Sequence, residues 1–150
     1  TAKKLMPAGA VYHCMHDEDV ENILAWPHTM IGSDGLPNDP HPHPRLWGAF
    51  PRVIGHYARK RGLFSIPTAI HKMTGLSASR FQLEKRGLIA NGYHADLVLF
   101  DAQTIRDTAT WEKPVQAAEG IEKVWVNGVL SFSDQQPLEA RAGQFLYRNN

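Results

Sequence analysis

The residues whose types and spacing indicate chemistry lie at the end of a short apolar run. Asp34 stands in the segment Ile-Gly-Ser-Asp-Gly-Leu-Pro at residues 31–37, between Ser33 and Gly35. A carboxylate at the point where a buried strand becomes a Gly/Pro-rich loop is held in a fixed direction, and such a group can accept and return a proton. Asp34 is therefore a candidate general base. The alternative is a turn-forming aspartate, since Ser-Asp-Gly is also good turn chemistry.

Two histidines in the following loop are candidate metal ligands. His41 and His43 alternate with prolines, which hold the loop extended and turn alternate side chains toward one another. Such a pair can bind a metal adventitiously, but a native open site normally needs three protein ligands. His13, Cys14 and His16 match no zinc spacing and are expected to be packing residues. No residue of the chain is therefore predicted to be a metal ligand.

Helices and short strands are expected to alternate around these residues in a first part, 1–84. The spacing of apolar residues predicts where these elements lie. Helix starts are expected at Asp17 and Ser65, and a helix end at Gly62. Prolines exclude a helix from the loop at 33–45. The predicted strands are 8–15 and 29–31, and the predicted helices are 18–25, 46–61, 65–75 and one starting at Ser77.

The sequence predicts a small β region for the second part, 85–150. Asn127 and Gly128 separate two apolar segments, 121–126 and 129–132, which is the strongest short-range signal for a β-hairpin. A buried strand is expected at 95–101, a short strand and turn at 87–92 and an edge strand at 144–148. Near residue 85 the spacing of apolar residues changes from a helical to a strand-like period. This change predicts a boundary between an α/β part and this β part.

Composition limits the possible partners and location. The chain has 150 residues, 43% of them hydrophobic, which suits one globular domain with a core. The net charge is +1 and the basic residues are scattered, so the sequence does not predict a basic surface that binds nucleic acid. No apolar run reaches the roughly 18 residues of a membrane span. The start of the chain has no signal-peptide pattern, and the single cysteine suits a reducing compartment, so we expect a cytoplasmic protein.

Four segments of the sequence resemble the C-terminal part of N-acyl-D-amino-acid deacylases, a branch of the amidohydrolase superfamily. They are Met-Ile-Gly-Ser-Asp-Gly-Leu-Pro at 30–37, His-Pro-Arg-Leu-Trp-Gly at 43–48, Ala-Ile-His-Lys-Met-Thr-Gly at 69–75, and 86–98 with Arg-Gly-Leu-Ile, Gly92 and Ala-Asp-Leu-Val. The first two are specific to the branch, whereas the last identifies only the superfamily. The resemblance runs from about Gly9 to the end of the chain.

The resemblance implies an α/β fold: the C-terminal part of a (β/α)₈ TIM barrel at 1–84 and a small β-sandwich portion at 85–150. In such a fold, residues 29–33 form the eighth barrel strand and Asp34 lies at its tip as the general base. A complete barrel needs about 250 residues. We therefore expect this chain to be the C-terminal portion of a longer enzyme.

The resemblance also implies a reaction: zinc-dependent hydrolysis of the amide bond of a small N-acyl-D-amino acid to a carboxylate and a free D-amino acid. Family members hold zinc through residues upstream of the region that this chain matches. Asp34 is expected to take a proton from the attacking water and pass it to the leaving amine. Arg45 is expected to bind the substrate carboxylate, with Ser33 and Gly35 beside it. A solvated arginine at a helix start is the alternative for Arg45.

Two other interpretations remain open from the sequence. The chain can belong to a different amidohydrolase, of the dihydroorotase or hydantoinase kind. It can also be a catalytically inert remnant with a structural or binding role. In a partial barrel, strand edges and an apolar face lack their usual neighbours, so we expect a tendency to self-association.

Overall fold

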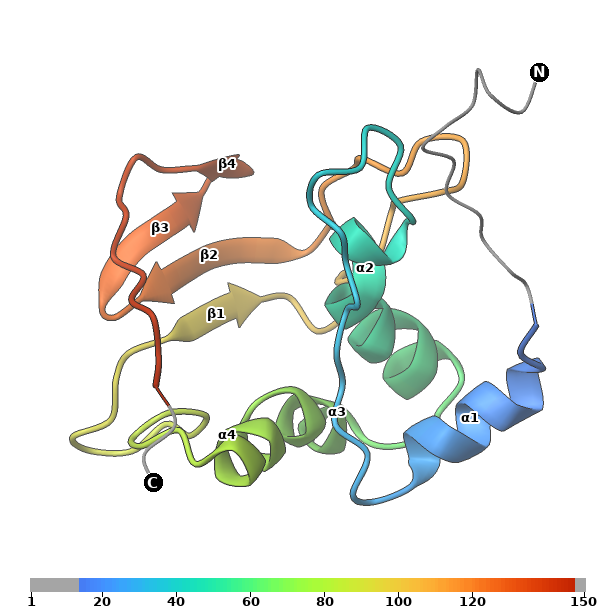
Figure 1. The fold of residues 1–150 in the computed structure, drawn as a ribbon, viewed down its shortest axis with the longest axis horizontal. Helices are drawn as coiled ribbons and strands as arrows, with labels where there is room; N and C mark the ends of the chain where they lie inside the picture. Colours follow the sequence, from blue (N-terminus) through green and yellow to red (C-terminus); the bar gives the residue numbers. More distant parts are fainter. Residues whose placement is uncertain (1–13, 148–150) are drawn as a thin grey trace.

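The computed structural model describes residues 14–147, which form a group of helices and an antiparallel sheet in the order β1-β2-β3-β4 (Figure 1). None of the helices within these residues is long and apolar enough to cross a membrane. The helices are α1 (Asp17–Ala25), α2 (Arg45–Arg52), the π-helical segment η2 (Val53–Lys60), α3 (Ile66–Met73) and α4 (Gly75–Phe81), and the strands are β1 (Leu97–Phe100), β2 (Ile121–Val126), β3 (Val129–Ser133) and β4 (Gln136–Pro137).

Helix α1 confirms the helix predicted at 18–25, but the role given to Asp17 is wrong. The helix starts at Asp17 itself, after His16, whose side chain makes no capping hydrogen bond. Acidic residues at 17–19 fill the first turn, where negative charge interacts favourably with the positive end of the helix dipole. Asp17 therefore acts through its charge in the first turn and does not cap the helix.

The helix predicted at 46–61 is confirmed as one continuous helical segment with a change of geometry inside it. Pro51 lies within α2 and has no N–H group for the helical ladder. The segment continues from Val53 as the wider π-helix η2. Gly62 ends it with a left-handed φ of +64°, as expected of a glycine that follows a helix.

Helix α3 begins as predicted, and α4 begins earlier than predicted. The Ser65 hydroxyl accepts a hydrogen bond from the Thr68 N–H at 3.2 Å, and Pro67 lies in the first turn. Helix α4 starts at Gly75 and not at Ser77. Only Thr74, with φ −129° and ψ −89°, interrupts the helical path between the two helices.

The core joins the helices to the chain that follows β1. Its buried apolar residues come from η2, from α3 and from Ile105, which is 2% exposed; they are Val53, Ile54, Ala58, Ala69 and Ile105. Gly55 makes the contact possible, since a Cβ at this position would lie 2.5 Å from the Ile105 carbonyl oxygen. The backbone after β1 therefore lies directly on η2.

The predicted β-hairpin is confirmed. Strands β2 and β3 pair antiparallel with Val126 opposite Val129, and the turn residues Asn127 and Gly128 have φ values of +48° and +81°. These values fit the turn that Asn-Gly favours in two-residue hairpins. The strand predicted at 95–101 is shorter, and it is not buried, because Val98 and Leu99 of β1 are 55% and 45% exposed.

Three predicted strands are absent from the described part of the chain: residues 29–31, 87–92 and 144–147 are not strands. A strand needs a neighbour to pair with, and the Ile31 N–H bonds instead to the carbonyl of Lys72 in α3 at 3.3 Å. The strand predicted at 8–15 lies outside the described residues except for Cys14 and Met15, which are not in a strand.

The fold class is therefore confirmed only at a coarser level. Helices and a small antiparallel sheet are present, as a partial α/β domain requires, but residues 14–147 show neither a barrel nor a second sheet that would complete a sandwich (Figure 1). The division of the chain near residue 85 stays a prediction.

Replacing Gly55 with alanine is expected to destabilise the protein by about 1–3 kcal/mol, because the new methyl group meets backbone that cannot move aside easily. The measurement is the midpoint of urea unfolding at an unchanged slope. Gly143→Ala is the matched control, since nothing lies within 4 Å of its added Cβ. An equal shift of the midpoint in both variants would contradict the close packing of η2 on Ile105.

Candidate active site

Asp34 lies in a turn at the end of the extended segment that follows α1. Its φ is +47°, in the left-handed region, which aspartate tolerates better than most residues that carry a side chain. The Ser33 hydroxyl accepts a hydrogen bond from the Gly35 N–H at 3.3 Å and closes the turn. The Asp34 side chain is 81% exposed, so its carboxylate is accessible from solvent.

Arg45 is the first residue of α2 and approaches Asp34 directly. Its Nη2 atom lies 2.7 Å from Oδ2 of Asp34. Within the part of the chain that the structure describes, the Arg45 Nε atom is buried and has no hydrogen-bond partner. The guanidinium thus pairs with Asp34 through Nη2, while its Nε has no acceptor among the described residues.

Gly35 brings these two side chains together. A Cβ at Gly35 would lie 2.6 Å from Cδ1 and 3.2 Å from Cα of Leu46, so a larger residue would force the Leu46 side chain and the start of α2 to shift. The structure therefore places Ser33, Asp34, Gly35 and Arg45, the residues predicted for the site, at one location. Their parts in a reaction remain predictions.

The histidines of the same loop contact Trp111 and the start of α2. Nε2 of His41 lies 3.0 Å from the Trp111 carbonyl oxygen. Nδ1 of His43 accepts a hydrogen bond from the Arg45 N–H at 3.0 Å, and its ring lies edge-on to the Trp111 ring with centroids 4.6 Å apart. Among residues 14–147, no group of three or more His, Cys, Asp or Glu side chains is placed to hold a metal ion.

Lys72 is a residue of this region that the sequence interpretation missed. It is 1% exposed, and its Nζ donates to the carbonyl oxygens of Trp26 at 2.5 Å and Thr29 at 3.3 Å. Burial lowers the pKa of its ammonium group. Together with the bond from Ile31 to its own carbonyl, these contacts fix the segment that leads to Asp34. A signal was present, because Lys72 lies one helical turn after Ala69 on the buried face of α3.

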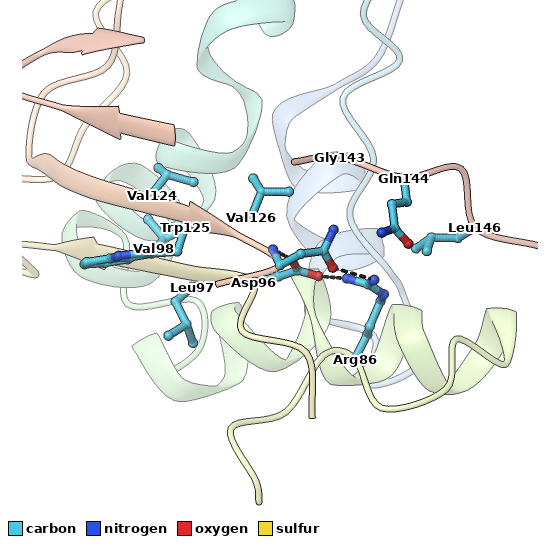
Figure 2. Close-up of a pocket in the computed structure, with 11 residues that line it drawn as sticks. Arg86, Asp96, Leu97, Val98, Val124, Trp125, Val126, Gly143, Gln144 and Leu146 are labelled. Atoms are coloured by element: carbon cyan, nitrogen blue, oxygen red, sulfur yellow. Dashed lines mark hydrogen bonds and ion pairs between the residues drawn. The ribbon is translucent and has the colours of Figure 1, made fainter. Parts of the chain in front are cut away.

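A separate pocket of about 320 Å³ lies in the β region and contains none of the predicted site residues (Figure 2). Arg86 reaches from the segment before β1 to the carboxylate of Asp96 and to the side-chain oxygen of Asn127 at 2.8 Å. The Asn127 N–H donates to Asp96 at 2.8 Å. These groups bond to one another across the pocket wall and fix the hairpin turn, and the rest of the lining is mostly apolar.

Comparisons with known proteins identify the family of the chain. Residues 4–132 match the family model described as "Amidohydrolase family". The chain is 56% identical over 145 residues to a D-aminoacylase from Alcaligenes xylosoxydans xylosoxydans, which covers 97% of the chain and 30% of that protein. It is 49% identical over 148 residues to an N-acyl-D-glutamate deacylase of the same organism, covering 99% of the chain and 30% of that protein.

Solved structures of similar proteins match the fold of the chain. A crystal structure of D-aminoacylase matches with a TM-score of 0.89 and 54% identity, over 92% of this chain and 29% of that one. N-acyl-D-glutamate deacylase from Bordetella bronchiseptica, complexed with zinc and a phosphonate inhibitor, matches with a TM-score of 0.91 and 47% identity, over 99% of this chain and 31% of that one. This chain spans about 30% of the length of these relatives, and it belongs to the amidohydrolase family.

Proposed function

We propose that this chain takes part in the zinc-dependent hydrolysis of N-acyl-D-amino acids, with Asp34 as the general base and acid and Arg45 as the group that binds the substrate carboxylate. The observation that carries the proposal is the 2.7 Å distance between these two side chains. In an N-acyl amino acid, one carbon atom separates the amide nitrogen from the carboxylate. A base that serves the amide and a cation that binds the carboxylate must therefore be neighbours.

Asp34 is suited to moving a proton. Its carboxylate is exposed at a turn that Ser33 closes and Gly35 holds against α2. In the proposed reaction it accepts a proton from the attacking water and returns it to the leaving nitrogen. Ser33 and Gly35 flank the carboxylate and are proposed to line the substrate site.

Arg45 is suited to exchanging its present partner for a substrate. An exposed ion pair such as the one with Asp34 is worth only up to about 1 kcal/mol. A substrate carboxylate that accepts two parallel hydrogen bonds from the guanidinium competes well with such a pair.

The relatives support a class of substrate, the N-acyl-D-amino acids, but do not indicate which side chain the substrate of this protein carries. They include a D-aminoacylase, an N-acyl-D-aspartate deacylase and an N-acyl-D-glutamate deacylase, at 56%, 51% and 49% identity. What the two named substrates share is the acylated nitrogen and the α-carboxylate of a D-amino acid. These are the groups that Asp34 and Arg45 are proposed to serve, which favours the deacylase over another kind of amidohydrolase.

Zinc enters the proposal through a relative whose structure contains it. A bound zinc ion lowers the pKa of its water and polarises a carbonyl group. A catalytic zinc site usually has three protein ligands, and residues 14–147 offer no group of three. The described residues alone do not fit a zinc site, and in the proposal the ligands lie upstream of this chain.

Asp34→Asn is expected to lower kcat by roughly 10²–10⁴-fold, because the amide cannot take the proton of the water. The assay uses an N-acetyl-D-amino acid and the protein extended to the length of its relatives, with zinc measured by inductively coupled plasma mass spectrometry. Zinc content should not change. Asp39→Asn, in the same loop, is the control and should keep full turnover. Retained activity in Asp34→Asn would rule out Asp34 as the base.

Arg45→Met is expected to lower kcat/KM for an N-acyl-D-amino acid by about 10- to 100-fold, because a hydrogen bond to a charged group contributes about 1.5–3 kcal/mol. The matching N-acyl-D-amino acid amide has no carboxylate, so the same change should affect its hydrolysis little. The measurement is kcat/KM for both compounds with the wild-type and variant proteins. Equal losses on the two compounds would contradict the role of Arg45 in binding the carboxylate.

The 150-residue chain by itself is expected to contain much less than one zinc ion per molecule after dialysis and to leave N-acetyl-D-amino acids intact. The physical reason is that the described residues supply too few ligands for a stable site. Metal analysis and a ninhydrin assay check the two points, with the extended protein as the positive control. Stoichiometric zinc together with turnover in the short chain would show that it carries the complete metal site.

A further inference from the structure

The chain between β1 and β2 makes an excursion, residues 107–118, that is braced by its own hydrogen bonds. The side-chain amide of Gln116 donates to the carbonyl oxygens of Thr108 and Lys113, both at 2.9 Å. The Thr108 hydroxyl donates to the Ala117 carbonyl at 2.7 Å, and the Thr110 N–H to the Lys113 carbonyl at 3.1 Å. These bonds give the excursion a defined shape.

The base of the excursion is fixed to α2, the helix that begins with Arg45. Arg52 in α2 pairs with Asp107 at 3.0 Å. A Cβ at Gly48 of the same helix would lie 3.0 Å from Cβ of Asp107, which shows how closely the two backbones approach. The excursion therefore keeps a fixed position relative to the start of α2.

The tip of the excursion reaches the loop that connects Asp34 to Arg45. Figure 1 shows the orange segment between β1 and β2 beside the cyan loop that precedes α2. Trp111 makes both contacts there: its carbonyl oxygen lies 3.0 Å from Nε2 of His41, and its ring lies edge-on to that of His43. Edge-to-face arrangements of this kind are favoured between aromatic rings.

His43 in turn fixes Arg45. Its Nδ1 accepts the N–H of Arg45, one of the first N–H groups of α2, which have no partner within the helix. The contacts thus run from Trp111 through His43 to Arg45, whose guanidinium reaches Asp34.

We propose that Trp111 is a positioning residue: it holds His43 and the loop at 36–44, so that the guanidinium of Arg45 is directed to the carboxylate of the substrate. The proposal rests on the function proposed above for Asp34 and Arg45. It adds that a segment of the β region determines the geometry of the candidate site. A displacement of about 1 Å at a binding group can reduce the rate about 10²-fold.

The first test compares Trp111→Ala with the conservative Trp111→Phe in the protein extended to the length of its relatives. Trp111→Ala is expected to lower kcat/KM for an N-acetyl-D-amino acid by about 10- to 100-fold, mainly through KM, with zinc content unchanged. Trp111→Phe keeps an aromatic ring against His43 and should restore most of the loss. Glu112→Ala, in the same excursion, is the matched control. A Trp111→Ala enzyme with wild-type kinetics would overturn the proposal.

A double-mutant cycle separates positioning from a general loss of stability. If Trp111 acts through Arg45, then Trp111→Ala should cause no further loss of kcat/KM in an Arg45→Met background. A merely structural role would reduce the activity of both backgrounds by the same factor. Additive losses would therefore overturn the proposal.

Hydrogen–deuterium exchange of the chain itself tests the contact without any assay of activity. Trp111→Ala should speed exchange in peptides that cover residues 36–46, whereas Trp111→Phe and Glu112→Ala should not. Unchanged exchange in Trp111→Ala would overturn the proposal. If exchange responds as expected but the extended wild-type protein hydrolyses no N-acyl-D-amino acid, the proposed function fails while the positioning of the loop by Trp111 is supported.

Discussion

The contact of Ile105 with η2 is the constraint on which the rest of the arrangement depends. Gly55 has no side chain, so the backbone after β1 lies against η2 and Ile105 is buried among the apolar residues of the helices. Interiors pack at the density of organic crystals, and an added methyl group at such a contact is not absorbed without displacement. This contact fixes the sheet relative to the helices, and it fixes where the excursion after β1 begins.

The candidate site is held from two sides by different physical means. On one side, the ammonium of Lys72 donates to the carbonyl oxygens of Trp26 and Thr29, which fixes the path of the chain toward Asp34. A buried lysine is costly unless its donors are satisfied, so its contacts define one arrangement of the backbone. On the other side, Trp111 contacts the loop that returns to Arg45. The carboxylate and the guanidinium meet between these two fixed segments.

Sequence reasoning succeeded where the signal lies within a few residues. Ser65 caps α3, Asn127 and Gly128 form the hairpin turn, and Gly62 ends η2, because each outcome depends on local backbone geometry. It failed for the strands predicted at 29–31, 87–92 and 144–147. An apolar segment with strand-like composition becomes a strand only when another strand lies beside it. Within the described residues, those segments have no such neighbour.

The sequence by itself determined most of the helices, the β-hairpin and the non-helical loop before Arg45. It also determined the family, through the segments around Asp34 and Arg45. It also determined that Ser33, Asp34, Gly35 and Arg45 are the residues to examine. Only the tertiary structure decided that Asp34 and Arg45 form an ion pair, that Lys72 is buried, and that Trp111 contacts His41, although 70 positions separate these two residues. The physical reason is that such contacts depend on how distant segments pack, and this packing cannot be predicted from the pattern of neighbouring residues.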